Sequence, residues 1–269
     1  MFLKLIYLTS FIFPSSAAKK AISLFLTPRK FKRPLSEKEW YESSTKRKLN
    51  CGFAINEWGS SSAQKILLVH GWEGRGAQLG AFAQPLVTEG YHVIALDGPA
   101  HGDSEGLQTN AGEFSRALIS VQQELGHVSA IIAHSFGGGC SILALNLGLK
   151  CDQLITIASP SDYAQVVAGF LKLVRLSPYS VKYCYQLLSA KAQLKVNELN
   201  IAQIGSGLKI PVMIVHDELD KEVPISNAYE LKQAWPESTF LKTQGLGHRR
   251  ILKDSQVVDE IIQFIKKNS

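Results

Sequence analysis

Long apolar runs, clustered cysteines and a large excess of one charge are all missing from this chain of 269 residues. It has 29 Lys and Arg against 23 Asp and Glu, and 45% of its residues are hydrophobic, which excludes collagen-like, disordered and multi-span membrane classes. The four cysteines show no C-x-x-C or Cys/His metal spacing, and a chain of this size needs no disulfide framework. The length suits one large α/β domain or two smaller domains.

The positive charge is unevenly distributed along the chain. The first 50 residues hold 11 Lys and Arg against 3 Asp and Glu, whereas the remainder holds 18 against 20. A nucleic-acid-binding protein would carry its basic residues across the folded domain. We therefore expect no nucleic-acid partner, and we interpret residues 1–45 as a basic and partly apolar N-terminal arm.

This arm allows two interpretations. Residues 5–13 are mostly apolar, follow Lys4 and precede small residues at 15–18, as in a short signal peptide, but they are too few to span a membrane. Alternatively, since the apolar pattern resumes at 21–26 among basic residues, the arm is a helix that packs on the body or makes a peripheral contact with an anionic membrane. We expect a cytoplasmic chain, with export or membrane association as the alternative if residues 1–17 act as a signal peptide.

Short β-branched runs alternate with longer helical patterns over most of the chain. Six runs predict buried strands: 65–70, 91–97, 128–134, 153–159, 211–217 and 239–243. Between them, apolar residues at helical spacing, such as Phe114, Leu118 and Val121, predict helices. The alternation predicts an α/β fold with a doubly wound, mostly parallel sheet and helices on both faces. Residues 46–57, centred on Gly52, are expected to add an antiparallel hairpin at the sheet edge.

The interval between the fourth and fifth predicted strands breaks this rhythm. It spans about 50 residues without a convincing strand, which is too long for a plain connection. It contains a helical stripe at Val167, Phe170 and Val174. We expect a small helical cap at about residues 160–209, inserted into an α/β domain that spans 46–269.

Ser135 lies where a predicted strand ends and a glycine-rich helix begins, in the segment AIIAHSFGGGC. A sharp turn at this point strains the backbone and requires small residues two positions away on either side. Those neighbours are Ala133 and Gly137, so the G-x-S-x-G pattern of a nucleophile elbow is met as A-H-S-F-G. Alone, this pentapeptide also fits a serine that caps a helix.

Two later segments extend the pattern. Asp220 follows a predicted strand in PVMIVHDELDKEVP, and His248 follows the last predicted strand in GLGHRRIL. The order Ser, Asp, His, each at the carboxyl end of a strand, is the order of the triad in α/β-hydrolases.

From about residue 46 to its end, the chain resembles the α/β-hydrolase superfamily. The resemblance rests on HGW at 70–72, DGPAHGDS at 97–104, the Ser135 elbow and the segments that hold Asp220 and His248. The longer strings HGWEGRGAQ, DGPAHGDSEG, AHSFGGG and GLGHRRIL are similar to a group of bacterial α/β-hydrolases without an assigned substrate.

Chemistry then suggests a role for each residue. Ser135 would attack an acyl carbonyl, and His248 would accept the serine proton and return it to the leaving group. Asp220 would fix the imidazole tautomer and stabilise the imidazolium. The resemblance implies an oxyanion hole formed by the backbone N–H groups of Trp72 and Phe136, where the loss of one donor costs about 100- to 1,000-fold in rate.

Other residues compete for the role of the acid, and one side chain has two possible uses. Asp217, Glu218 and Asp162 are alternative acids, because an acid that follows a neighbouring strand reaches the same histidine. The side chain of Trp72 is either a packing aromatic or a specificity element, since its proposed catalytic part needs only its backbone.

No cofactor and no metal are expected. Five histidines fall near predicted strand ends, in a spacing that fits no ligand pattern: His70, His101, His134, His216 and His248. The glycine run 137–139 belongs to no phosphate-binding motif. Arg249 and Arg250 are more typical of surface ion pairs than of a substrate carboxylate site, and Asp97 and Asp103 are expected to brace their loop.

The sequence thus predicts a serine hydrolase of a carboxylic ester, with a thioester or an amide as alternatives. Ser rather than Asp at the elbow argues against dehalogenase and epoxide-hydrolase chemistry. The apolar cap helices favour a small-molecule substrate with a hydrophobic part. A catalytically silent binding or interaction module with the same fold stays open, as does a membrane-surface lipase that uses the arm. The oligomeric state is not predicted.

Overall fold

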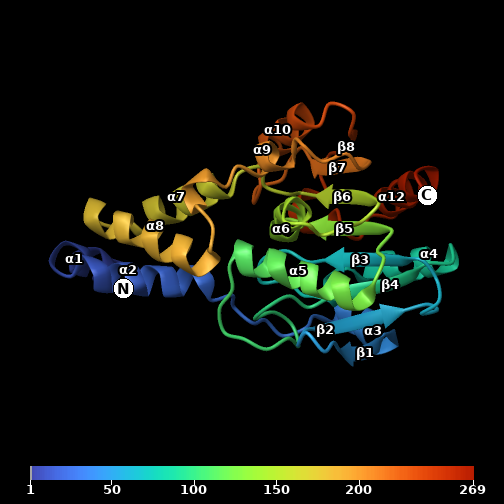
Figure 1. Cartoon of the computed structure of the whole chain (residues 1–269), viewed down its shortest axis with the longest axis horizontal. Helices are drawn as coiled ribbons and strands as arrows, with labels where there is room; N and C mark the ends of the chain where they lie inside the picture. Colours follow the sequence, from blue (N-terminus) through green and yellow to red (C-terminus); the bar gives the residue numbers. More distant parts are fainter. Residues whose placement is uncertain (1) are drawn as a thin grey trace.

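The computed structural model describes residues 2–269, with side chains described from residue 6, and its centre is an eight-stranded sheet (Figure 1). The order across the sheet is β1-β2-β4-β3-β5-β6-β7-β8. The strands are β1 (Thr45–Lys48), β2 (Ala54–Trp58), β3 (Lys65–Val69), β4 (His92–Leu96), β5 (Ala130–His134), β6 (Gln153–Ile157), β7 (Val212–Asp217) and β8 (Thr239–Thr243). Strands β3 to β8 are parallel to one another, whereas β2 runs antiparallel to both β1 and β4.

These strands confirm the predicted fold class, a doubly wound and mostly parallel sheet with helices on both faces. Each of the six predicted buried strands is present, with ends within two residues of those expected. The edge hairpin is present as well, with Thr45 opposite Glu57, and Gly52 in its turn has a φ of +96° that suits glycine.

Helices cover the two faces of the sheet, because alternate strand residues point to opposite sides and are apolar on both. Leu67 and Val69 face one core, and Ile66 and Leu68 face the other. The first face is covered by α5 (Ala111–Leu125), α6 (Phe136–Asn146), α9 (Ile201–Gly205) and α10 (Ser226–Ala234). The second is covered by η1 (Gly76–Phe82), α4 (Ala83–Thr88) and α12 (Ser255–Lys267), with α3 (Leu35–Ser43) packed on η1.

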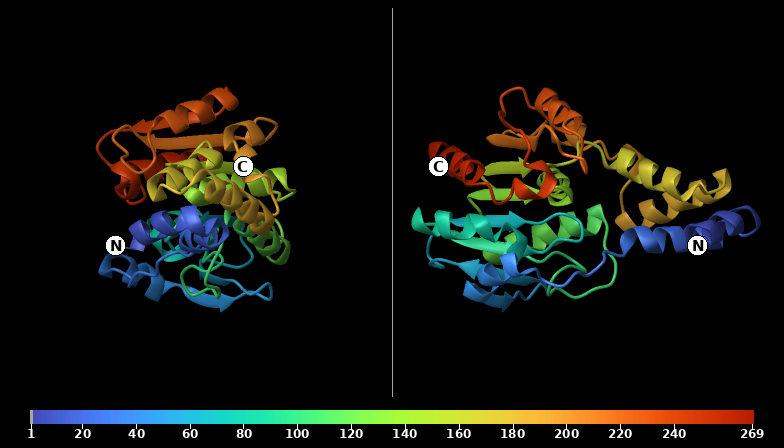
Figure 2. Two further views of the ribbon diagram at one scale, coloured as in Figure 1. Left: turned by 90° about the vertical axis from the view of Figure 1, so that its left-hand side faces the viewer. Right: turned by 180° about the vertical axis from the view of Figure 1, so that it is seen from behind.

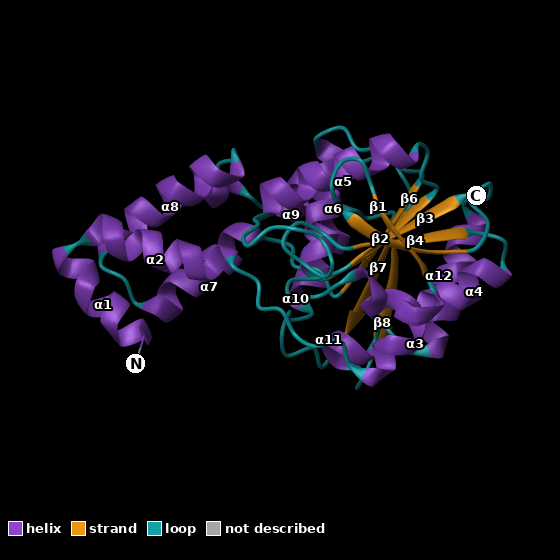
Figure 3. Cartoon of the chain, turned by 90° about the horizontal axis from the view of Figure 1, so that it is seen from below, coloured by secondary structure: helices purple, strands orange, loops and turns teal. Residues whose placement is uncertain are grey.

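Four helices extend from the carboxyl ends of the parallel strands as a separate layer, which we call the helical lobe (Figures 1 and 3). They are α1 (Phe2–Ile12), α2 (Pro14–Leu26), α7 (Tyr163–Val174) and α8 (Pro178–Ala192), and η2 (Val196–Glu198) leads from α8 back to the sheet. The views from the side and from behind show α1 and α2 alongside α7 and α8, although the two pairs are far apart in the sequence (Figure 2).

The contact between α2 and α8 is made by small buried side chains on α2. Ala17, Ala18 and Ala21 are buried, which lets the two helices approach closely, and they share one core with the first face of the sheet. Beneath α2, the Sγ of Cys184 lies 4.0 Å from the carbonyl oxygen of Ala18. Burial raises the pKa of this thiol to about 11. The arm therefore packs on the helices expected to form the cap, while the expected domain boundaries stay a prediction.

Candidate active site

Ser135 sits in the sharp turn between β5 and α6, as the elbow pattern predicts. Its φ is +52° and its ψ is −123°, and its backbone N–H donates to the carbonyl oxygen of Ile157 at 2.8 Å. A Cβ at Gly137 would lie 2.3 Å from the carbonyl oxygen of His70, and a Cβ at Gly138 would lie 1.7 Å from the Oγ of Ser159. These glycines let α6 approach the neighbouring strands closely enough to hold the strained serine.

A continuous series of hydrogen bonds joins Ser135 to two residues from later strands. The Oγ of Ser135 lies 3.0 Å from Nε2 of His248, on the short helix α11 (Gly247–Arg250) that follows β8. The Nδ1 of His248 lies 2.7 Å from Oδ2 of Asp220, in the loop after β7. The structure thus brings together the three residues that the sequence assigned to the triad, within the reach that proton transfer requires.

Asp220 is held as a carboxylate by its surroundings. Burial alone would raise its pKa, but hydrogen bonds from His248 and from the backbone N–H of Val223 outweigh burial, so the pKa lies below its ordinary value. Oδ1 also accepts from the backbone N–H of Glu222 at 2.8 Å. An ionised Asp220 obliges His248 to keep a proton on Nδ1, which leaves Nε2 free to accept one from Ser135.

The three alternative acids have other partners. Asp217 accepts from the hydroxyl of Thr243 and from backbone N–H groups, and so ties the end of β7 to the loop that carries His248. Glu218 forms an ion pair with Lys242. Asp162 caps the start of α7 through the backbone N–H of Gln165. Of the four acids considered, only Asp220 is hydrogen-bonded to His248 in the part of the chain that the structure describes.

Two further histidines support this series of hydrogen bonds, and sequence reasoning missed their roles. The Nε2 of His134 donates to the carbonyl oxygen of His248 at 2.9 Å, with ring centroids 4.6 Å apart. Burial, and then the nearby charge of His248, lower the pKa of His134 to about 3, so the ring is neutral at physiological pH. His216 donates to the carbonyl oxygen of Val223 at 2.9 Å and so fixes the loop of Asp220.

The two residues predicted to donate to the oxyanion have side chains in contact. The N–H of Trp72 has no hydrogen-bond partner among the described residues, and Phe136 is the first residue of α6, where an N–H has no partner within the helix. The rings of Trp72 and Phe136 meet edge to face, 5.2 Å between centroids. The side chain of Trp72 therefore packs against that of Phe136.

Polar contacts brace the loop that carries Trp72. The Nε2 of His70 accepts from the backbone N–H of Gly98, and the Nε2 of His101 accepts from that of Glu73, both at 3.0 Å. Asp97 accepts from two backbone N–H groups of the same region, and its burial raises its pKa to about 6. On its outer side, Arg29 of the arm forms a bidentate ion pair with Glu73.

Asp103, the other residue expected to brace this loop, donates its backbone N–H to Asp97. Asp103 lies 3.4 Å from the guanidinium of Arg33. Arg249 forms an exposed ion pair with Glu222, and Arg250 donates to a backbone carbonyl oxygen. Within the described residues, no group of three or more His, Cys, Asp or Glu is arranged to hold a metal ion.

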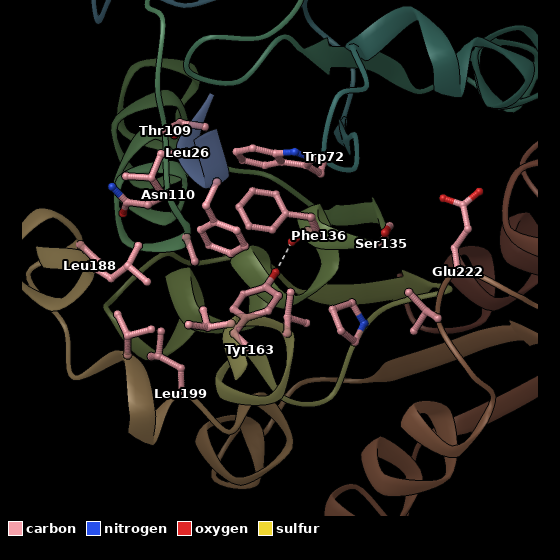
Figure 4. Close-up of a pocket in the computed structure, with 18 residues that line it drawn as sticks. Leu26, Trp72, Thr109, Asn110, Ser135, Phe136, Tyr163, Leu188, Leu199 and Glu222 are labelled. Carbon is pink, nitrogen blue, oxygen red and sulfur yellow. Dashed lines mark hydrogen bonds between the residues drawn. The ribbon is translucent and has the colours of Figure 1, made fainter. Parts of the chain in front are cut away.

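An apolar cavity of about 310 Å³ opens beside Ser135, between the sheet and the helical lobe (Figure 4). Its wall includes Leu188 and Leu199 from the segment after β6, and the hydroxyl of Tyr163 donates to the carbonyl oxygen of Phe136 across its floor. Its volume is at the lower end of the range for small-molecule sites. A largely apolar wall suits the hydrocarbon part of a substrate.

The end of α2 also forms part of this wall. Phe25 and Leu26 both line the cavity, and the Phe25 ring lies 4.6 Å from that of Phe170 on α7. The arm thus contributes directly to the site, although the resemblance at the sequence level began only near residue 46. The apolar pattern at 21–26 was the available signal, but it could not identify the surface that covers it.

Two family models match the chain. The model described as the alpha/beta hydrolase family matches residues 66–182, and the one described as a TAP-like protein matches residues 177–268. Together they extend over the sheet from β3 onward and over the residues that surround Ser135.

Individual proteins that match the chain share less than a third of its aligned residues. The chain is 27% identical over 258 residues to lysophosphatidylserine lipase ABHD12 of Danio rerio, covering 85% of this chain and 61% of that protein, so it spans less than two thirds of that relative. It is 21% identical over 245 residues to pimeloyl-[acyl-carrier protein] methyl ester esterase of Aliivibrio fischeri, covering 76% and 94%. A thermophilic esterase from Thermogutta terrifontis shares the fold, with a TM-score of 0.62, 16% identity and coverage of 84% and 100%.

Proposed function

This chain belongs to the α/β-hydrolase superfamily, and on that premise we propose that it is a serine hydrolase that cleaves a carboxylic ester through an acyl-enzyme on Ser135. The observation that carries the proposal is the series of hydrogen bonds from Ser135 through His248 to Asp220 at the mouth of an apolar cavity. A helix-capping serine would need neither of these partners.

The proposed mechanism follows from the contacts of each group. Because a serine hydroxyl is a weak nucleophile, Nε2 of His248 accepts its proton as Oγ attacks the acyl carbonyl. Asp220 keeps the imidazole oriented and stabilises the positive charge that develops on it. His248 then protonates the departing alcohol, and a water molecule attacks the acyl-enzyme with the same histidine acting as base.

Charge that develops on the carbonyl oxygen needs donors already in place. The N–H groups of Trp72 and Phe136 are the proposed donors, and the bracing of the Trp72 loop by His70 and His101 supports a fixed position for the first of them. Donors held in advance need no reorganisation as the reaction proceeds, which is why such holes contribute strongly to rate.

The cavity supports an ester with an apolar acyl group as the substrate. Leu26, Val167, Leu188 and Leu199 would surround such a group beyond Ser135, and no cofactor enters the mechanism. The names of the two curated relatives describe a lipase and a methyl ester esterase, which favours an ester over a thioester or an amide.

A fluorophosphonate probe tests the nucleophile. We expect purified full-length protein to be labelled at Ser135 and the Ser135→Ala variant to stay unlabelled, with an unchanged melting temperature. Absence of labelling in the wild type, or labelling that survives the substitution, would refute the serine hydrolase and favour a silent binding module. A chain-length series of chromogenic esters then defines the acyl preference.

A further inference from the structure

The far end of the helical lobe exposes large apolar side chains to solvent. The exposed fractions are 60% for Phe11 and 73% for Ile12 at the end of α1, 62% for Phe13 in the turn before α2, and 70% for Leu173 near the end of α7. Such a group is unusual on the surface of a soluble protein, where large exposed apolar patches mark interaction sites.

Hydrogen bonds bring the two turns of the lobe together at this end. The hydroxyl of Ser177 donates to the carbonyl oxygen of Ser10 at 2.6 Å, and that of Ser180 donates to the carbonyl oxygen of Pro14 at 3.1 Å. The exposed apolar residues at these turns and on the adjoining helix ends therefore form one surface, which we call the lobe tip. It consists of Leu8, Phe11, Ile12, Phe13, Leu173, Tyr179 and Tyr183.

The charge of the lobe has a single sign. The segments 2–26 and 163–192 contain seven Lys and Arg and no Asp or Glu, whereas the rest of the chain has 22 against 23. The side chain of Lys4 lies outside the described residues. The other six basic side chains are exposed, and none forms an ion pair with a described residue. They are Lys19, Lys20, Lys172, Arg175, Lys182 and Lys191. The lobe is thus cationic beside its apolar tip.

We propose that the lobe tip docks on the surface of an anionic lipid bilayer. Aromatic and aliphatic side chains would enter the interface between headgroups and acyl chains, and the flanking lysines would pair with anionic headgroups. Among the described residues, no helix is long and apolar enough to cross a membrane, which fits a segment that lies at the interface.

The charge also argues against a second copy of this chain as the occupant of the tip. Two such tips, brought face to face, would bring together two lobes that both carry only positive charge, without a counter-charge. Anionic lipids supply that counter-charge. On a bilayer, both the apolar and the cationic residues would therefore favour binding, whereas in a dimer the apolar residues would favour association and the cationic residues would oppose it.

An apolar stripe connects the tip to the cavity. On α7, Leu173, Phe170 and Val166 are three and four residues apart and so share one helix face, and Val166 lines the cavity. A lipid that enters at the tip would keep its acyl chain on this stripe as far as the site. This step rests on the proposed hydrolase function, whereas docking itself does not.

Flotation of the full-length protein with phosphatidylcholine vesicles, with and without phosphatidylserine, tests the docking. We expect binding to the anionic vesicles to be at least about tenfold tighter, and to weaken at high salt because exposed charges are screened. The triple variant Phe11→Ser, Ile12→Ser, Phe13→Ser should bind about 100-fold more weakly. Leu35→Ser, on the exposed side of α3, should bind as the wild type does.

A charge-reversed pair separates the lobe from net charge in general. Lys172→Glu with Lys182→Glu should weaken binding to anionic vesicles by about tenfold or more. The same reversal on the body, Lys150→Glu with Lys209→Glu, changes net charge equally and should have little effect. All variants replace exposed side chains, so unchanged melting temperatures and fluorophosphonate labelling should show that the fold is intact.

Three results would overturn the proposal. The first is that the wild type does not bind anionic vesicles. The second is that the charge reversals on the body weaken binding as much as those on the lobe. The third is that the protein does not bind vesicles but forms a dimer that depends on Phe11 to Phe13. A wild type that is not labelled by fluorophosphonate would refute only the proposed hydrolase function. Vesicle binding would still test the proposed docking.

Discussion

The carboxyl edge of the sheet and the helical lobe are built on different principles. At the sheet edge, Ser135, His248 and Asp220 follow three different strands and meet at 3.0 and 2.7 Å, with each position fixed by further hydrogen bonds. In the lobe, the interior is held by small and aliphatic side chains, and the exposed side is apolar and cationic. The sheet therefore fixes the geometry of the triad, whereas the lobe presents apolar and cationic surfaces for binding.

This difference separates two kinds of specificity. Hydrogen bonds at the sheet edge depend on tenths of an ångström, so substitutions there should change turnover. Apolar contacts in the lobe depend on area and shape, so substitutions there should change which substrates and surfaces are bound.

The largest effect is expected at the sheet edge, from Asp220→Asn. An amide in this position no longer fixes the tautomer of His248, so kcat should fall about 10⁴-fold with little change in KM. Steady-state hydrolysis of a short chromogenic ester measures this. The control is Asp162→Asn, which keeps the cap of α7 and should leave kcat within about twofold of the wild type. An equal loss in both variants would mean that Asp220 has no special role.

An intermediate effect is expected where the lobe lines the cavity. Leu26→Ala removes apolar contact with the acyl chain, so kcat/KM for long-chain esters should fall about tenfold, while that for short-chain esters stays nearly constant. Ile22→Ala is the matched control, since Ile22 is equally buried on α2 but does not line the cavity. Both should lower stability by about 2–5 kcal/mol. The comparison between lobe and sheet would fail if Ile22→Ala shifted the chain-length preference as well.

The smallest effect is expected in the segment between α2 and α3, from Arg29→Ala. Hydrogen bonds from Arg29 keep the pKa of Glu73 below its ordinary value, so the pair persists at neutral pH. Since the Arg29 side chain is largely exposed, loss of the pair should lower kcat only about twofold through the Trp72 loop. This difference from the wild type should fade at high salt, and as the pH falls until Glu73 is protonated. Arg47→Ala breaks a similar pair with Glu57 in the hairpin of β1 and β2 and should leave kcat unchanged.

The sheet was predictable because its signals are local. Apolar runs of five to seven residues marked β3 to β8, and the small residues around Ser135 marked the elbow. Parallel strands place their carboxyl ends at one edge, so the positions of Asp220 and His248 followed from chain order alone.

The helical lobe was less predictable because its contacts join distant segments. The sequence showed apolar faces at 21–26 and in the interval after β6, but nothing local showed that one would cover the other. The roles of His134 and His216 were missed for the same reason, since their partners are backbone carbonyl oxygens that a sequence pattern does not display. The location of the chain in the cell stays a prediction.

The rate at which a reagent modifies the thiol of Cys184 would report how often α2 separates from α8. This thiol lies under α2, and its pKa is raised to about 11. A thiol reagent therefore reaches a reactive thiolate only when α2 separates from α8. The half-buried Cys51, in the distant hairpin turn, provides an internal reference for reagent chemistry. The ratio of the two modification rates would report how often the arm opens, and vesicles that hold the lobe closed would slow only the first of them.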